Sequence, residues 1–158
     1  MRRQAISEQA AAEIGPLTDR EVLVAGAIAY WCEGAKNKTY RRPENRVTFV
    51  NSDPRLILFF LRFLEVAEID RERIRCNVAI HESSDVAGAQ RFWQQLTGLP
   101  SEQFRRPVLK RHNPKTTRKN TGDDYHGCLV ITVGKATELY RQIEGWASAV
   151  MDSHTMSD

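Results

Sequence analysis

The residues most able to do chemistry stand at the end of one apolar segment. Ala25, Ala29 and Glu33 are spaced four residues apart, so a helix would align them on roughly one side. If a second copy of this helix packed on that side, two Glu33 carboxylates would meet. Such a pair needs a divalent cation between its members, or one member must take up a proton. The same spacing is also typical of an ordinary core helix that ends in a solvated glutamate.

Positive charge is concentrated in one stretch of the chain. Residues 105–119 contain seven Lys or Arg and no Asp or Glu, whereas the rest of the chain has a net charge of −4. So dense a stretch repels itself unless an anion meets it, which favours a polyanion-binding surface over a solvated loop. The side chains that could contact a nucleic acid are Arg106, Lys110, Arg111, His112, Asn113, Lys115, Arg118 and Lys119. Arg41, Arg42 and Arg46 could extend this surface from an earlier hairpin.

Histidine and cysteine offer weaker alternatives. An HNH-type nuclease site could use His112, Asn113, Asn120 and His126. Their spacing does not place them on a hairpin followed at once by a metal-binding helix. A zinc site from Cys76, His126 and Cys128 lacks paired CxxC or HxxxH spacing. The sequence has no glycine-rich phosphate loop and no GxSxG elbow, which disfavours nucleotide-driven motors, dinucleotide enzymes and serine hydrolases.

Length and composition indicate one globular domain. The chain has 158 residues, of which 41% are hydrophobic and 27% charged. We expect an N-terminal lead-in at 1–16, a single domain at 17–151 and a disordered tail at 152–158. No apolar run approaches the roughly 20 residues of a membrane span. The odd cysteine count and the lack of an apolar signal core lead us to expect a cytoplasmic, nucleoid-associated protein.

Hydrophobic periodicity predicts the elements that must position these residues. Thr18 and Glu21 form a capping box that begins a helix running to about Glu33, with Gly34 as its stop. Three later helices are predicted to begin near residues 53, 83 and 135, and strands are predicted at 46–51, 73–80, 104–109 and 126–133. Residues 36–45 could be a loop or half of a hairpin. Because helices and strands mix without regular βαβ alternation, we predict an α+β fold with a mainly antiparallel sheet.

With these elements in this order, the sequence resembles the LAGLIDADG homing endonucleases, and more closely their stand-alone, single-motif relatives of actinobacterial type. The matching segments are 29–36, 51–54, 80–82 and 110–115. The resemblance implies a homing-endonuclease-like fold, in which a saddle-shaped sheet packed on helices lies in the major groove of double-stranded DNA. It also implies a homodimer, because the chain carries one motif. Trp31 stands where the family motif has its earlier acidic residue.

The resemblance further implies how such a protein would act. Glu33 would bind the catalytic Mg²⁺, and a lysine near the scissile phosphate would polarise the attacking water. Lys36, Lys110 and Lys115 are the candidates for that lysine. The leading expectation is therefore a Mg²⁺-dependent DNA endonuclease. The alternatives are a non-catalytic DNA-binding transcriptional regulator of the same fold and an RNA-binding protein, since a basic surface does not distinguish nucleic acids.

Overall fold

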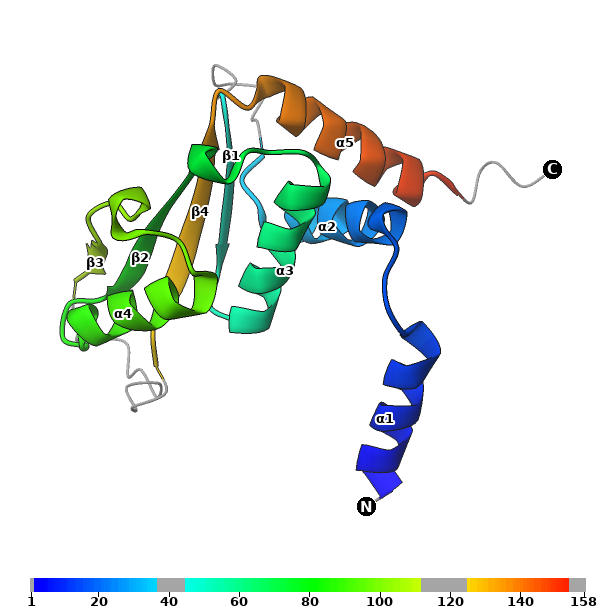
Figure 1. Ribbon diagram of the computed structural model, residues 1–158, viewed down its shortest axis with the longest axis horizontal. Helices are drawn as coiled ribbons and strands as arrows, with labels where there is room; N and C mark the ends of the chain where they lie inside the picture. The colour runs from blue at the N-terminus through cyan, green and yellow to red at the C-terminus, as the bar shows by residue number, and fades with distance from the viewer. Residues whose placement is uncertain (1, 37–44, 112–124, 154–158) are drawn as a thin grey trace.

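The computed structural model describes residues 2–36, 45–111 and 125–153 (Figure 1). Its helices are α1 (Arg2–Ile14), α2 (Asp19–Glu33), α3 (Pro54–Val66), α4 (Val86–Thr97) and α5 (Thr137–Met151). Its strands are β1 (Arg46–Asn51), β2 (Ile74–His81), β3 (Val108–Lys110) and β4 (Cys128–Gly134). Single 3₁₀ turns at Arg71–Arg73 and Ser101–Gln103 precede β2 and β3. The four predicted helices and the predicted strands at 46–51, 73–80 and 126–133 are confirmed, with ends that shift by a few residues.

The four strands form one sheet in the order β1-β4-β2-β3. Strand β4 is antiparallel to both β1 and β2, so Val130 lies between Val50 and Asn77. Strand β3 is parallel to β2, because α4 carries the chain back across the sheet between them. The predicted α+β class with a mainly antiparallel sheet is therefore confirmed.

The predicted strand at 104–109 is interrupted. Phe104 forms an isolated bridge with Cys76, and the Arg105 amide donates to the Cys76 carbonyl at 2.7 Å. Regular pairing resumes only at Val108. Pro107 lies in the gap, and it has no amide proton to give to the neighbouring strand.

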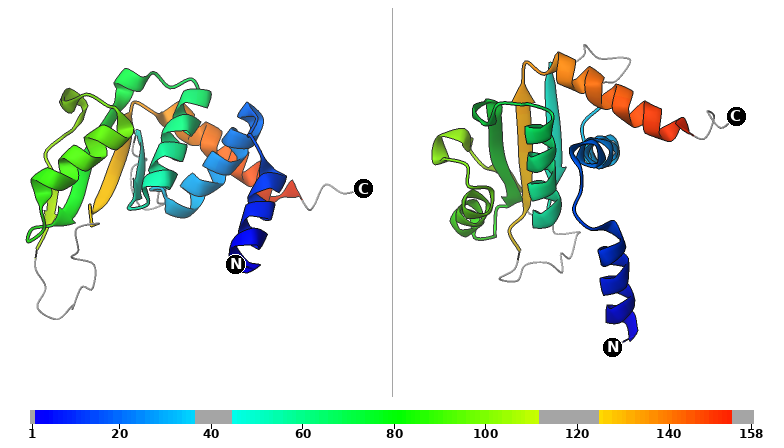
Figure 2. Two further views of the ribbon diagram at one scale, coloured as in Figure 1. Left: turned by 60° about the horizontal axis from the view of Figure 1, so that its bottom comes forward. Right: turned by 45° about the vertical axis from the view of Figure 1, so that its right-hand side comes forward.

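The core lies on one face of the sheet. Side chains alternate along a strand, and the large apolar side chains of β1, β2 and β4, such as Phe49, Cys76 and Ile131, point to the same side. Helices α2, α3, α4 and α5 contribute to the same hydrophobic cluster, with Tyr30, Phe60, Trp93 and Ile143 all at 0% exposure. Figure 2 shows α5 beginning beside the sheet and running away from it past α2. We call the opposite side of the sheet its outer face.

Helix α1 stands apart from this body. It has no buried residue, and Figure 1 shows it extending away from α2. The chain turns after it at Gly15, whose φ of 62° lies in the left-handed region that glycine tolerates best. In the part of the chain that the structure describes, each helix is too short or too polar to cross a lipid bilayer.

Candidate nucleic-acid interface and acidic site

The outer face of the sheet consists of alternate residues from all four strands. Arg46, Thr48 and Val50 come from β1, and Cys128, Val130 and Thr132 from β4. Arg75, Asn77, Ala79 and His81 come from β2, and Val108 and Lys110 from β3. Thr132, Ala79 and His81 are nearly covered, and the other members are exposed or half-buried.

The charges on the strands have one sign and one location. The four strands contain no Asp or Glu, and their charged residues are Arg46, Arg75 and Lys110. All three lie on the outer face, because each has the register of the outward-pointing residues in its strand. The outer face is therefore cationic and otherwise neutral, with Thr48, Asn77 and Thr132 as hydrogen-bonding groups. Such a surface suits the phosphates and base edges of a nucleic acid.

Sequence reasoning identified two of these three cations. Arg46 and Lys110 were predicted, whereas Arg75 was missed because it lies outside the basic stretch. The signal that could have found it is the alternation of Ile74, Cys76 and Val78, which places Arg75 on the other side of the strand. Its guanidinium donates to the carbonyls of Glu72 and Ile74 at 2.6 and 2.9 Å, which fixes it at the start of β2.

The basic stretch is only partly described. Arg106, Lys110 and Arg111 are exposed, and β3 places Lys110 opposite His81. The other predicted contact residues lie outside the described residues; they are Arg41, Arg42, His112, Asn113, Lys115, Arg118 and Lys119. The described residues thus place the start of the basic stretch at the β3 edge of the sheet.

Glu33 is the last residue of α2 and is exposed. The capping box predicted at the other end of the helix is confirmed, since the Thr18 hydroxyl accepts from the Glu21 amide at 3.2 Å. Directly after Glu33, Gly34 bridges Phe49, and the Ala35 amide donates to the Thr48 carbonyl at 2.9 Å. The acidic end of α2 is therefore held at the β1 edge of the sheet.

Tyr30 makes this attachment rigid. Its ring is fully buried, and its hydroxyl donates to the Ala35 carbonyl at 2.5 Å while accepting from the Thr48 amide at 3.4 Å. Burial raises the pKa of Tyr30 to about 12, so the hydroxyl keeps its proton at neutral pH. Tyr30 thereby links the last turn of α2, the chain after it and β1.

Helix α2 is buried on one side only. Its fully covered residues are Val22, Gly26, Ala27 and Tyr30, which face α3 and α5. The opposite side carries a stripe of small and apolar residues, formed by Val24, Ala25, Ile28, Ala29 and Cys32. Val24 is 37% exposed, and Ala25 and Cys32 are also open to solvent. We call these five residues the α2 open stripe; Val24, Ala25 and Cys32 are exposed, whereas Ile28 and Ala29 are half-buried.

Gly26 serves a contact within the chain. A Cβ atom at this position would lie 2.1 Å from Cδ2 of Phe63, so the glycine lets α3 approach α2 closely. The small residue beside Ala25 and Ala29 is thus explained by packing inside the protomer.

The candidate lysines lie at opposite edges of the sheet. The Lys36 ammonium lies 5.2 Å from the centre of the Trp31 ring, a cation–π contact beside Glu33 in the chain. Lys110 is on β3, three strand positions from β1, or about 14 Å at the usual strand spacing. Within one chain, only Lys36 of these two is near Glu33. Lys115 lies outside the described residues.

The described histidines have structural surroundings. His81 is 8% exposed, and its Nδ1 lies 2.6 Å from the Ser83 hydroxyl. His126 stacks on Phe92 at 3.7 Å, and its carbonyl accepts from the Trp93 indole at 2.8 Å. These contacts favour a structural role for His81 and His126. The other HNH candidates, His112, Asn113 and Asn120, lie outside the described residues.

Glu33 is the candidate metal ligand that the sequence predicts. Among residues 2–36, 45–111 and 125–153, no three His, Cys, Asp or Glu side chains come together as a metal-binding group. Mg²⁺ commonly uses one or two protein carboxylates and completes its shell with water and phosphate oxygens. An exposed Glu33 suits that donor set, and two Glu33 residues from two copies suit it better.

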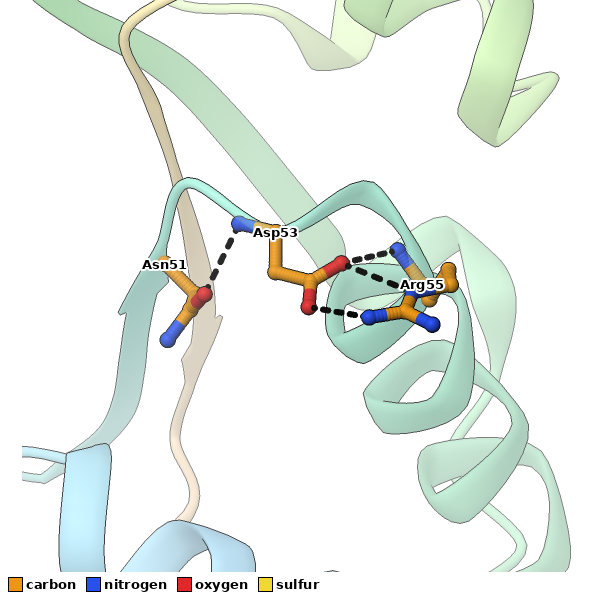
Figure 3. Close-up of polar contacts among 3 residues, drawn as sticks. All are labelled: Asn51, Asp53 and Arg55. Carbon is orange, nitrogen blue, oxygen red and sulfur yellow. Dashed lines mark hydrogen bonds and ion pairs between the residues drawn. The ribbon is translucent and has the colours of Figure 1, made fainter. Parts of the chain in front are cut away.

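The segment Asn51–Arg55 joins β1 to α3 (Figure 3). The Asn51 side chain accepts from the Asp53 amide at 2.8 Å, and Asp53 caps α3 by accepting from the Arg55 amide at 2.9 Å. Hydrogen bonds from Arg55 lower the pKa of Asp53, so its carboxylate is charged at neutral pH. These contacts are local, which indicates that the segment shapes a turn.

The function of the chain has to be inferred from its own geometry. No protein-family model matches it, and searches of curated proteins and of solved structures found no significant match. The assignment of function therefore depends on the cationic outer face, the α2 open stripe and Glu33.

Proposed function

We propose that the protein binds double-stranded DNA with the outer face of its sheet, as a homodimer joined along the α2 open stripe. One observation carries the proposal: the strands have three charged residues, all basic and all on the outer face. A sheet face of this kind can follow a groove, with its cations meeting phosphates and Asn77 and Thr48 within reach of bases.

The homodimer accounts for the uncovered side of α2. Pairing two open stripes would remove Val24, Ile28 and Cys32 of each copy from water. Because α2 ends at the β1 edge, the same pairing brings two β1 edges and two Glu33 residues toward a common axis. The two outer faces then form a longer cationic surface, and the DNA site it reads has twofold symmetry.

The proposed chemistry is phosphodiester hydrolysis at this axis. Glu33 from each copy would hold Mg²⁺, which when bound supplies Lewis-acid activation of water and of a phosphate oxygen. Lys36 carries a positive charge close to Glu33 in the chain and can hold the phosphate beside it. The Trp31 ring limits the positions that the Lys36 ammonium can take.

A non-catalytic DNA-binding regulator is the second candidate. The observation that favours it is Trp31, which stands at the position where the resembling family has another acid beside the one that matches Glu33. Binding without cleavage needs the outer face and the dimer but does not need Glu33.

A DNA-binding experiment tests the shared part of the proposal. Replacing Arg46, Arg75 and Lys110 by Gln should weaken binding to duplex DNA at least tenfold. It should also flatten the dependence of log K on log salt by about 0.9 for each phosphate that the variant no longer neutralises. The control replaces Arg62, Arg91 and Arg141 on α3, α4 and α5 by Gln, which removes the same charge away from the outer face. Equal effects in the two variants would show that only net charge matters and would refute the interface.

A nicking assay separates the two candidates. If the protein is a nuclease, supercoiled plasmid should be nicked with Mg²⁺ present, and Glu33→Gln should lower the rate at least a hundredfold while DNA affinity is kept. Tight binding without nicking on any DNA supports the regulator. Nicking that persists in Glu33→Gln would show that Glu33 is not the site.

A further inference from the structure

Helix α1 has no packing partner in the described part of its own chain. None of its 13 residues is buried, and Ile6 and Ile14 are 59% and 68% exposed. An isolated helix shorter than about 15 residues is marginal in water. The charges of α1 also oppose its dipole, because Arg2 and Arg3 stand in the first turn and Glu13 in the last. These features indicate that α1 needs a second surface.

The helix offers such a surface a narrow apolar stripe. Ile6, Ala10 and Ile14 are four residues apart and therefore lie on one side of α1. The whole helix is about 20 Å long at the usual rise per residue. Ala12 lies on nearly the opposite side, at about 100° per residue.

An apolar groove lies where α1 joins the body. It has a volume of about 950 Å³ and runs between α2 and the end of α5. Its lining includes Leu17, Val24, Phe59, Trp146 and Val150. Ile14, the last residue of α1, is among its lining residues, so α1 ends at the groove. The rest of α1 extends away from α2 (Figure 1).

The groove is continuous with the α2 open stripe, because Val24 and Ala25 belong to both. The stripe from Val24 to Cys32 is only about 12 Å long. A stable interface needs about 800 Å² from each partner, which is more than so short a stripe of small residues supplies. We propose that α1 of each copy lies in the groove of the other copy, so that two exchanged helices complete the dimer. This inference rests on the proposed homodimer.

A photo-cross-linking experiment tests the occupant. Ile6→p-benzoylphenylalanine, made as a mixture of ¹⁴N- and ¹⁵N-labelled full-length chains, should give cross-links between light and heavy chains that map to the groove. Cross-links confined to one chain would show that α1 folds onto its own body. Cross-links to added DNA or to vesicles alone would show a different role for α1. Any of these results would overturn the exchange.

A matched pair of variants measures the contribution of α1 to the affinity of the dimer. Ile6→Asp should raise the dimer dissociation constant at least tenfold, whereas Ala12→Asp adds the same charge on the other side and should leave it unchanged. Both positions are exposed, so neither change disturbs the protomer core. Equal effects of the two changes would refute the exchange.

Cysteine cross-linking tests the homodimer independently of the helix exchange. Cys32 is exposed on the open stripe, so a short bismaleimide should join two wild-type chains and fail with Cys32→Ser. If Cys32 cross-links the dimer and Ile6→Asp leaves the dimer dissociation constant unchanged, the helix exchange is rejected and the dimer is kept. No Cys32 cross-link and a monomer at high concentration would reject both.

Discussion

Tyr30 couples the acidic end of α2 to the sheet through a single buried hydroxyl. The hydroxyl joins the Ala35 carbonyl to the Thr48 amide, and the ring packs between Phe60 and Tyr140 at 6.1 and 6.4 Å. Nothing in the local sequence shows this role, because it depends on Thr48, which is 18 positions away and is brought alongside by the fold.

Removing that hydroxyl should loosen the acidic site. Tyr30→Phe keeps the ring but leaves the Ala35 carbonyl without its donor, so we expect the free energy of unfolding to fall by about 1–2 kcal/mol. Urea denaturation at neutral pH measures the change. A stability equal to wild type would show that water replaces the hydroxyl without cost.

Two buried acids should limit stability at high pH. Burial raises the pKa of Tyr30 from 10.0 to about 12, and burial raises the pKa of the Cys76 thiol from 9.0 to about 12. Because the pKa values are higher in the folded state, the protonated Tyr30 and Cys76 contribute to the free energy of unfolding. That contribution is complete below about pH 9 and is lost as pH rises toward about 12. Urea midpoints measured from pH 8 to pH 11.5 should therefore fall steeply, and less steeply in Tyr30→Phe. Parallel curves for the two proteins would contradict the assignment to Tyr30.

At the scale of elements, one helical glycine is required and another is dispensable. A Cβ at Gly26 would lie 2.1 Å from the Phe63 ring, which stacks on Phe60 and meets Trp146 edge-on. The ring has little room to move, so Gly26→Ala should cost about 1–3 kcal/mol.

Gly145 in α5 provides the control for this prediction. A Cβ there has nothing within 4 Å, so Gly145→Ala should stabilise the protein by up to about 1 kcal/mol through helix propensity. Thermal or urea unfolding of both variants decides the point. If both changes stabilise, α3 does not need the close approach that Gly26 allows.

An element could be predicted from the sequence where neighbouring residues determine it, and could not where contacts distant in the chain determine it. The starts of α2 and α3 could be predicted because Thr18, Glu21 and Asp53 cap the helices they precede. The strands could be predicted from the alternation of apolar and polar residues. This alternation indicates that one side of the strand is buried, independently of which element packs on it. The parallel pairing of β3 could not, because it depends on where α4 returns the chain. The interruption near Pro107 was visible in principle, since proline cannot pair as a strand residue does.

The candidate site shows the same division. Glu33 and the basic stretch could be found from residue types alone, but their separation could not. Sheet order places Lys110 and β1 at opposite edges, and that order is a long-range property. Whether the Ala25 and Ala29 side of α2 is open could not be decided either, because the same spacing is typical of an ordinary core helix.

For the whole molecule, polarity divides between the two sides of the sheet. The hydrophobic core and four helices occupy one side, and the cations of the strands occupy the other. Changes on the outer face can therefore alter binding with little effect on the core, which is why the Gln variants of Arg46, Arg75 and Lys110 should remain folded.

The central position of β4 has a consequence for biosynthesis. Strands β1 and β2 do not pair with each other; each pairs with β4, which is the last strand in the described part of the chain. On the ribosome, the nascent chain therefore carries two unjoined strands until residues 128–134 emerge between them. A chaperone that shields exposed strand edges would be most useful during that interval, and a premature stop before Cys128 would leave β1 without its partner and β2 paired with the short β3 alone.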